Sequence, residues 1–185
     1  MKYVSLDIET LGLDPSHDDV IEFAAVIDDF ESPIEDLPKL HCYVTRPDNN
    51  YRGNAYAMSM HPVILRRIAT REDGYGYVPS DYLAEYFADW LASHDLNYKI
   101  VFAGKNFGAF DMQFLLRLDF GSHVKIHHRS LDPGSMYFDP KIDEVPPDMQ
   151  ECLMRAGIAT SVTHKALDDA LDVIRLIRHK YSIPL

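Results

Sequence analysis

Four acidic residues lie inside otherwise apolar segments that are far apart in the sequence. Asp7 and Glu9 stand near the start, Asp111 in the middle and Asp169 near the end. A carboxylate in apolar surroundings costs free energy unless a cation neutralises it. Carboxylate oxygens are also the ligands that Mg²⁺ and Mn²⁺ prefer in proteins. The four acids therefore predict a site for divalent metal ions.

The first two acids belong to a predicted strand over residues 2–9. Apolar and polar residues alternate there, which places Ser5, Asp7 and Glu9 together on one face. Asp7 and Glu9 would project side by side and repel each other unless they shared a cation. The alternative for this segment taken alone is an edge strand that carries ordinary surface acids.

A predicted helix over about 164–180 contains two adjacent aspartates, and a helical wheel separates them. Asp169 falls at the border of the apolar arc, so we expect it to point toward the core. Asp168 falls in a polar stripe that should face water, together with Asp172, Arg175 and His179. His164 precedes the helix, where it could act as a base or serve only as a turn or capping residue.

The third acid follows a short apolar run at 100–103, which predicts a buried strand. Glycines then mark a turn into a helix, and Asp111 stands in its first turn. The amino end of a helix favours negative charge. An ordinary acid at a helix start is therefore the alternative for Asp111 taken alone.

Together these segments resemble the DEDD superfamily of 3′–5′ exonucleases, which includes oligoribonuclease, ribonuclease T and the proofreading subunit of bacterial DNA polymerase III. Three motifs carry the resemblance. They are Asp-Ile-Glu-Thr, which begins at Asp7, Asn-x4-Asp-x2-Phe-Leu, which begins at Asn106 and includes Asp111, and His-x4-Asp, which runs from His164 to Asp169. The histidine of the third motif is typical of the DEDDh branch. The motifs are distributed over nearly the whole chain.

The resemblance implies an α/β fold of the ribonuclease H-like kind, with a central mixed five-stranded sheet flanked by helices. It also implies that Asp7, Glu9, Asp111 and Asp169 bind two Mg²⁺ or Mn²⁺ ions and that His164 is the general base. Two ions about 4 Å apart can activate a water and stabilise the leaving oxygen. The expected reaction removes nucleoside 5′-monophosphates from the 3′ end of single-stranded RNA, DNA or short oligonucleotides.

Further family resemblances predict substrate contacts in the loop after the first motif. Backbone amides of this loop and the Thr10 hydroxyl could bind the terminal hydroxyl, and an apolar side chain such as Leu13 could wedge beside the base. The residues expected in this loop are Thr10, Leu11, Gly12 and Leu13.

Two other segments are expected to lie against the terminal nucleotide. One resembles the family's Ala-x3-His-Gly-Ile stretch and supplies Met58, Met60 and His61, although a proline follows the histidine here. The other contains Asn106, which is expected to make a polar contact to the nucleotide, and Phe107, which is expected to form a wall of the nucleotide pocket. Methionines are also ordinary core residues, so packing is the alternative for Met58 and Met60.

Composition limits the partners that can be expected. A chain of 185 residues with 46% hydrophobic residues can bury one good core, so we expect one exonuclease domain over 1–185. The formal net charge of −11 argues against a long nonspecific nucleic-acid track, which needs many Lys and Arg residues. A short 3′ end held by metal ions is easier to reconcile with this charge.

Other features indicate a soluble cytoplasmic protein. The two cysteines, Cys42 and Cys152, form no CxxC motif, so neither a zinc site nor a disulfide framework is indicated. The first expected catalytic acid at Asp7 leaves no room for a cleavable signal sequence. No stretch approaches the roughly 20 apolar residues that cross a bilayer, so no membrane partner is expected. Relatives of this kind often form homodimers, and we include a homodimer among the expected assemblies.

A noncatalytic nucleic-acid or protein-binding module on a decayed nuclease fold is the alternative function. It predicts that at least one of the five active-site residues is missing, and all five are present.

Periodicity and turn residues predict the remaining layout. We expect loops over 45–56 and 130–147, and an antiparallel meander at the start of the chain. Strands are expected at about 2–9, 20–28, 40–45, 99–103 and 123–127. Helices are expected near 61–69, 80–93, 148–157 and 164–180, in addition to the helix that begins near Asp111.

Overall fold

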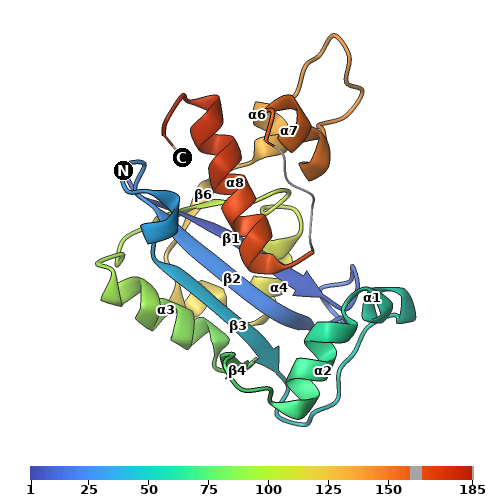
Figure 1. Ribbon diagram of the computed structural model, residues 1–185. Coiled ribbons are helices and arrows are strands. Elements are labelled where there is room, and N and C mark those ends of the chain that lie inside the picture. Colours follow the sequence, from blue (N-terminus) through green and yellow to red (C-terminus); the bar gives the residue numbers. More distant parts are fainter. Residues whose placement is uncertain (159–163, 185) are drawn as a thin grey trace.

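The computed structural model describes residues 1–158 and 164–184. Its centre is a six-stranded mixed sheet with the strand order β4-β3-β2-β1-β5-β6 (Figure 1). The first three strands form the antiparallel meander that the sequence predicts, and the other three pair in parallel. The strands are β1 (Tyr3–Thr10), β2 (Val20–Asp28), β3 (Lys39–Thr45), β4 (Tyr77–Pro79), β5 (Ile100–Ala103) and β6 (Ile126–Leu131).

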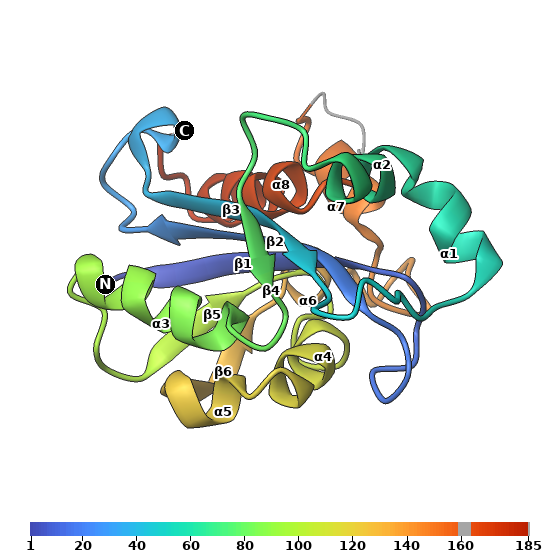
Figure 2. The same cartoon turned by 90° about the horizontal axis from the view of Figure 1, so that it is seen from below.

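Helices cover both faces of the sheet. The long helix α8 lies along one face, and α3, α4 and α5 lie on the other (Figure 2). The helices are α1 (Ala55–Met60), α2 (Pro62–Thr70), α3 (Leu83–Ser93), α4 (Asp111–Arg117), α5 (Phe120–His123), α6 (Pro133–Met136), α7 (Met149–Arg155) and α8 (Ala166–Lys180), with a 3₁₀ turn η1 (Ile34–Asp36). None of the helices in the described residues is both long and apolar enough to cross a membrane.

The alternation of β1 decides which layer each of its residues joins. Val4, Leu6 and Ile8 are buried in the core beneath α3, α4 and α5. Tyr3 lies on the opposite face, in the core that α8 covers. Because side chains alternate along a strand, Asp7 shares the face of Tyr3 and therefore lies on the α8 side. The meander and α8 together bring the two ends of the sequence to one site.

The expected five-stranded sheet is wrong by one strand. The additional strand β4 pairs in parallel with β3 at one edge. It has only three residues and ends at Pro79, so neither an alternation nor a long apolar run indicated it. At the other edge, β6 covers residues 126–131 and not 123–127, because residues 120–123 form α5.

Three other boundaries also differ from the sequence prediction. The loop expected over 45–56 ends where α1 begins at Ala55, and the loop expected over 130–147 contains the end of β6 and the whole of α6. Asp132 caps α6 by accepting the backbone N–H of Gly134 at 2.7 Å. The final helix begins at Ala166 and not at about residue 164, and His164 precedes it as expected.

Candidate active site

Strand β1 brings two of the predicted ligands to the centre of the sheet. Asp7 lies opposite Ala24 and Glu9 lies opposite Glu22 in the antiparallel pairing with β2. The pairing shifts register between Glu9 and Thr10, so regular strand geometry ends directly after the second acid. Both carboxylates are therefore held by a strand that pairs with β2 along their length and with β5 at Val4 and Ser5.

Helix α8 supplies Asp169. The Ser5 hydroxyl of β1 donates a hydrogen bond to the backbone carbonyl of Ala170 at 2.7 Å, which fixes the helix against the strand. Asp169 is 8% exposed, whereas the Asp168 side chain is 46% exposed. The predicted orientation of the two aspartates is thus confirmed. The expected water-facing stripe is wrong at Asp172, which is buried and pairs with Arg175 at 2.5 Å.

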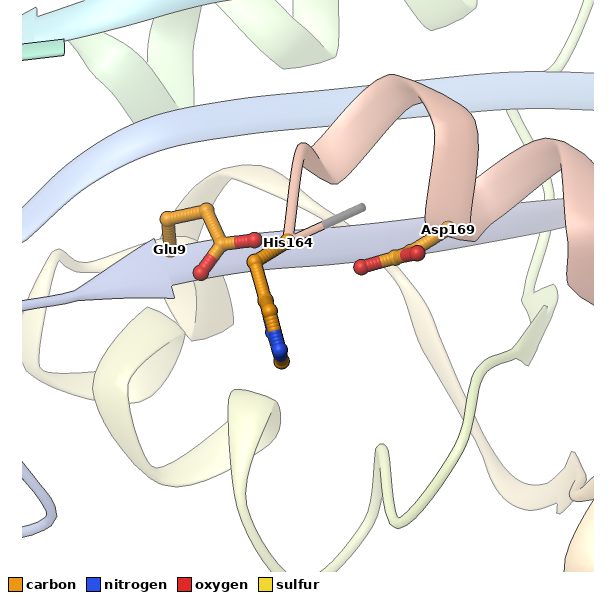
Figure 3. A group of neighbouring side chains, drawn as sticks. All are labelled: Glu9, His164 and Asp169. Atoms are coloured by element: carbon orange, nitrogen blue, oxygen red, sulfur yellow. The ribbon is translucent and has the colours of Figure 1, made fainter. Parts of the chain in front are cut away.

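His164 lies beside two of the acids. It is exposed and adopts a left-handed backbone conformation, with φ of 51°, just before α8. Potential ligand atoms of Glu9, His164 and Asp169 all lie within 4.8 Å of one another. Figure 3 shows the carboxylates of Glu9 and Asp169 directed toward each other, with His164 between them. Residues separated by most of the sequence therefore form one cluster.

Asp111 completes the acidic cluster from helix α4. It is the first residue of that helix and is buried. Burial raises its pKa to about 7, against the smaller opposing effect of hydrogen bonds from the backbone N–H groups of Asp111 and Ile8. The Ile8 contact links the start of α4 to the middle of the Asp-Ile-Glu sequence.

Burial disfavours the charged form of all four carboxylates, and the charges of neighbouring acids add to this effect at Asp7, Glu9 and Asp169. The pKa of Asp7 is raised well above its usual value, first by burial and then by the charges of Asp111, Glu9 and Asp169. Burial and neighbouring acids raise the pKa of Glu9 to about 8. For Asp169, burial raises the pKa to about 6 although the nearby His164 opposes the shift. Such a cluster can be fully ionised near neutral pH only when cations neutralise it.

The donor set fits hard divalent cations. All four acids present oxygen ligands, which suit Mg²⁺ and Mn²⁺. Within the described part of the chain, Asp169 Oδ1 is buried and has no hydrogen-bond partner. A buried carboxylate oxygen without a partner is costly, so this atom is free to serve as a metal ligand.

A fifth acid, Glu22, was not predicted from the sequence. It is 2% exposed on β2, accepts the backbone N–H of Ala166 at 3.2 Å and lies 2.6 Å from Nε2 of His41. Glu22 thus holds the first residue of α8 next to Glu9. The available signal was an acid inside the apolar segment Val20–Asp28, the same signal that identified Asp7.

Comparison with known proteins identifies the family of this chain. Residues 4–177 match the RNase T family, described as exonucleases. The chain belongs to this exonuclease family. The expected relationship to DEDDh-type 3′–5′ exonucleases and the ribonuclease H-like fold are both confirmed. No curated protein matches the sequence.

Solved structures of exonuclease I resemble this RNase T family member. One is the structure of exonuclease I that suggests how processivity is achieved. It matches this chain with a TM-score of 0.72 and 15% sequence identity, and the match covers 98% of this chain and 41% of the exonuclease I chain. E. coli exonuclease I in complex with a dT13 oligonucleotide has a TM-score of 0.69 and 17% identity, covering 96% and 40%. The moderately thermophilic exonuclease I from Methylocaldum szegediense has a TM-score of 0.67 and 17% identity, with the same coverage. At these identities the likeness shows the fold, and the chain spans about two fifths of the length of those proteins.

The loop that follows the first motif in this exonuclease family member is held by its own contacts. The Thr10 hydroxyl donates to the Gly12 carbonyl at 2.7 Å. Leu13 is 81% exposed, as a side chain that wedges beside a base would have to be. A Cβ atom at Gly12 would lie 1.9 Å from Asp18 Oδ2, so the loop backbone approaches that carboxylate closely.

The side chains of Leu11 and Phe107 are buried and do not reach the surface of the protein. Leu11 is fully buried, its N–H donates to the Asp19 carbonyl and its carbonyl accepts the N–H of Asn54. Phe107 is buried and stacks on Phe102, with ring centroids 5.0 Å apart. Both side chains thus lie in the core, and the contacts expected from the backbone of Leu11 and from the Phe107 ring stay predictions.

The segment before α2 places one histidine directly against the acids. His61 is buried, and its Nε2 lies 3.5 Å from Glu9 Oε2. Burial is the main cause that lowers the pKa of His61. Met60 is partly exposed and lines a cavity of about 610 Å³ together with His61 and His164. Met58 packs against the core beneath α2, which is the packing alternative.

Asn106 lies at the turn before α4 and is exposed. Its backbone N–H donates to Asp132 Oδ2 at 3.1 Å, and its side-chain oxygen accepts from Lys105 Nζ at 2.8 Å. The side-chain amide nitrogen of Asn106 therefore remains the group that could contact a substrate.

Proposed function

We propose that this chain is a metal-dependent 3′–5′ exonuclease that acts on single-stranded nucleic acid and releases nucleoside 5′-monophosphates. The observation that carries the proposal is the convergence of Asp7, Glu9, Asp111 and Asp169 with His164 from separate parts of the sequence. Membership of the RNase T exonuclease family supports the same activity. We further propose that residues 1–185 act as one exonuclease domain.

The four carboxylates would hold two Mg²⁺ or Mn²⁺ ions. Such ions, when bound, activate a water and stabilise charge on the phosphate and the leaving oxygen. Support comes from the oxygen-only donor set, from the pKa values of Asp7 and Glu9, which burial and neighbouring acids raise, and from the unpartnered Asp169 Oδ1. The rigid positions of Asp7 and Glu9 on a paired strand would fix their geometry before any substrate arrives.

His164 would take the proton from the attacking water. The water oxygen forms a bond to the terminal phosphorus, and the bond from phosphorus to the 3′ oxygen of the preceding nucleotide breaks. That oxygen leaves and takes up a proton, so the products are a nucleoside 5′-monophosphate and a chain shortened by one nucleotide. An exposed histidine at the start of a helix can reach both the acids and solvent, which suits a general base.

Single-stranded DNA is the first substrate to test. Two similar structures contain exonuclease I with dT13 and with dA16 oligonucleotides. RNA of the same sequence is the matched comparison, since discrimination between the two requires a contact to the 2′-hydroxyl. With a net charge of −11, the protein is better suited to bind the terminal nucleotide through metal ions than to contact many phosphates along a strand.

The test is an incubation of 5′-labelled oligonucleotides with the protein and Mg²⁺ or Mn²⁺. A ladder of products that differ by one nucleotide is expected for the wild type and not for Asp7→Ala. Circular dichroism should show that Asp7→Ala keeps the fold. An intact oligonucleotide that nevertheless binds the wild type would favour the noncatalytic binding module. Unchanged activity of Asp7→Ala would contradict the assigned site.

A further inference from the structure

Cavities lie along the β6 edge of the sheet, beyond the catalytic residues. Within the described residues β6 is an edge strand that pairs with β5, and it lies next to α5 and α4 (Figure 2). Two adjoining cavities, of about 640 and 430 Å³, share Gly108 and Ser130 in their walls, and together they are called the β6 groove. The smaller cavity reaches Asn106 and Ala109, at the turn that leads into Asp111. The groove therefore begins beside the proposed active site.

The charge of the larger cavity is opposite to that of the whole protein. Lys99, His123, Lys125, His127 and His128 line it, and among the described residues no Asp or Glu does so. The sequence as a whole has 29 acidic residues against 18 Lys and Arg. An acid-free basic lining is therefore a local feature that the overall charge conceals.

The lining combines this charge with apolar and ring surfaces. Met112 and Leu116 of α4 contribute apolar surface, and Leu116 is exposed. The rings of His127 and His128 stack on each other with centroids 4.5 Å apart. Positive groups beside flat or apolar surfaces are what single-stranded nucleic acid requires, because phosphates pair with the former and bases stack on the latter.

The acids near the groove are already engaged. Asp132 lines the smaller cavity, but its two oxygens accept the backbone N–H groups of Gly134 and Asn106 at 2.7 and 3.1 Å. Asp119 pairs with His123 at 3.6 Å across one turn of α5. Lys99 and Lys125 are the Lys and Arg side chains that line the larger cavity among the described residues, and the Lys125 ammonium donates to the Asn97 carbonyl at 3.2 Å.

We propose that the β6 groove binds the sugar-phosphate backbone of single-stranded nucleic acid on the 5′ side of the nucleotide being removed. This inference rests on the proposed exonuclease function. The six residues of β6 extend over about 20 Å, which is the length of several stacked nucleotides. The net negative charge still disfavours long nonspecific tracks, but one basic channel provides a local path for the strand.

A second copy of this chain or a peptide strand fits the edge less well. Strand addition to β6 would bring a partner's backbone against exposed basic side chains, and charged residues on an edge strand oppose such pairing. Two copies that met through β6 would also bring their basic linings together. A polyanion is the occupant that this charge favours.

The test compares substrate lengths in a double charge reversal, Lys99→Glu/Lys125→Glu. We expect KM for a 5′-labelled oligonucleotide of about 12 nucleotides to rise about tenfold, because two attractive interactions with phosphates become repulsive. For a dinucleotide, which does not extend to the larger cavity with Lys99 and Lys125, KM and kcat should stay at the wild-type values. Lys2→Glu/Lys141→Glu is the matched control, because it changes the charge equally at exposed positions outside the groove.

A binding arm separates this proposal from the exonuclease function. In an Asp7→Ala background, fluorescence anisotropy should show that the groove reversal weakens the binding of the 12-nucleotide strand about tenfold. The slope of the logarithm of the binding constant against the logarithm of the salt concentration should become less negative by about 1.4. This is about 0.7 for each phosphate that a lysine no longer neutralises. This arm reports on the groove even if the wild type cleaves nothing.

Three outcomes would overturn the proposal. The first is an unchanged KM for the long strand, and the second is an equal rise for both lengths, which would place the effect in the active site. The third is a wild-type dimer, detected by sedimentation, that the reversal dissociates while strand binding stays unchanged, which would assign β6 to self-association. The milder pair Lys99→Gln/Lys125→Gln should show the same length dependence, with thermal unfolding used to verify that each variant is folded.

Discussion

Two neighbouring aspartates on α8 have opposite environments, which allows a matched comparison at the scale of single residues. We expect Asp169→Asn to lower kcat by about a hundredfold or more, because it removes a charged oxygen ligand from the cluster. Asp168→Asn should stay within about twofold, since its side chain lies toward solvent near Lys165. Single-turnover cleavage of a 5′-labelled oligonucleotide measures both variants. The reverse order of effects would show that the wrong aspartate was assigned.

His164 and His61 are both near Glu9, but they differ in exposure. We expect His164→Gln to lower kcat by about 10²–10⁴-fold, the usual contribution of a general base, while Mg²⁺ affinity measured by calorimetry changes little. His61→Gln is the comparison, since His61 is buried and contacts Glu9 at 3.5 Å. It should alter KM and kcat by less than the His164 variant. Equal losses in kcat would contradict the assignment of the base.

The sequence predicted the charged residues of the site better than its apolar ones. An acid inside an apolar strand, such as Asp7, is unusual enough to indicate chemistry from type and spacing alone. Leu11 and Phe107 lie within the same motifs, yet an apolar residue in a motif can face either the core or a ligand. Only the packing of the folded chain distinguishes these cases, and here both are in the core. Glu22 carried the same signal as Asp7 but no recognised motif surrounded it.

At the scale of elements, Glu22 connects β2 to the start of α8. We expect Glu22→Ala to destabilise the first turn of α8 by about 1 kcal/mol, the usual effect of losing an oxygen that accepts a helix-start N–H. Because His164 and Asp169 lie in and beside that turn, kcat should fall as well. Glu22→Gln keeps an oxygen acceptor and should restore much of the activity.

Hydrogen exchange separates this role from a general loss of stability. In Glu22→Ala the backbone amides at the start of α8 should exchange faster, while those of the β1 and β2 centre should keep their protection. Uniformly faster exchange across the sheet would contradict a local positioning role. Failure of Glu22→Gln to recover activity would mean that the negative charge, and not the hydrogen bond, is what the site needs.

Elements with a strong periodic signal were predicted well, and short ones were not. The alternation of β1 and the amphipathic pattern of α8 extend over 8 and 15 residues, long enough to define a face. β4 has three residues and α5 has four, which is fewer than one repeat of either pattern can establish. These short elements form because β3 and α3 provide surfaces to pack on, and that information is tertiary.

For the whole molecule, the acidic cluster has a consequence for stability. The folded protein without metal raises the pKa of Glu9 to about 8 and that of Asp111 to about 7, against ordinary values of 4.5 and 3.8. Between about pH 4 and pH 8 the folded state therefore binds more protons than the unfolded state. Stability should consequently fall as pH rises through this window. Asp29 and Asp143, with pKa values lowered to about 2, lose their stabilising effect only on acidification below about pH 4.

Thermal unfolding with a chelator should show this fall between pH 5 and pH 8, and Mg²⁺ or Mn²⁺ should reverse it most strongly at pH 8, where the acids are most fully ionised. Asp7→Asn removes one charge from the centre of the cluster, so we expect the metal-free variant to be about 1–3 kcal/mol more stable than the wild type at pH 8. Its stability should also depend less on pH and respond less to metal. If the variant were less stable than the wild type under these conditions, the Asp7 carboxylate would stabilise the folded state instead of destabilising it. A stabilised, inactive variant would indicate that these carboxylates are kept together for binding cations, at a cost in folding free energy.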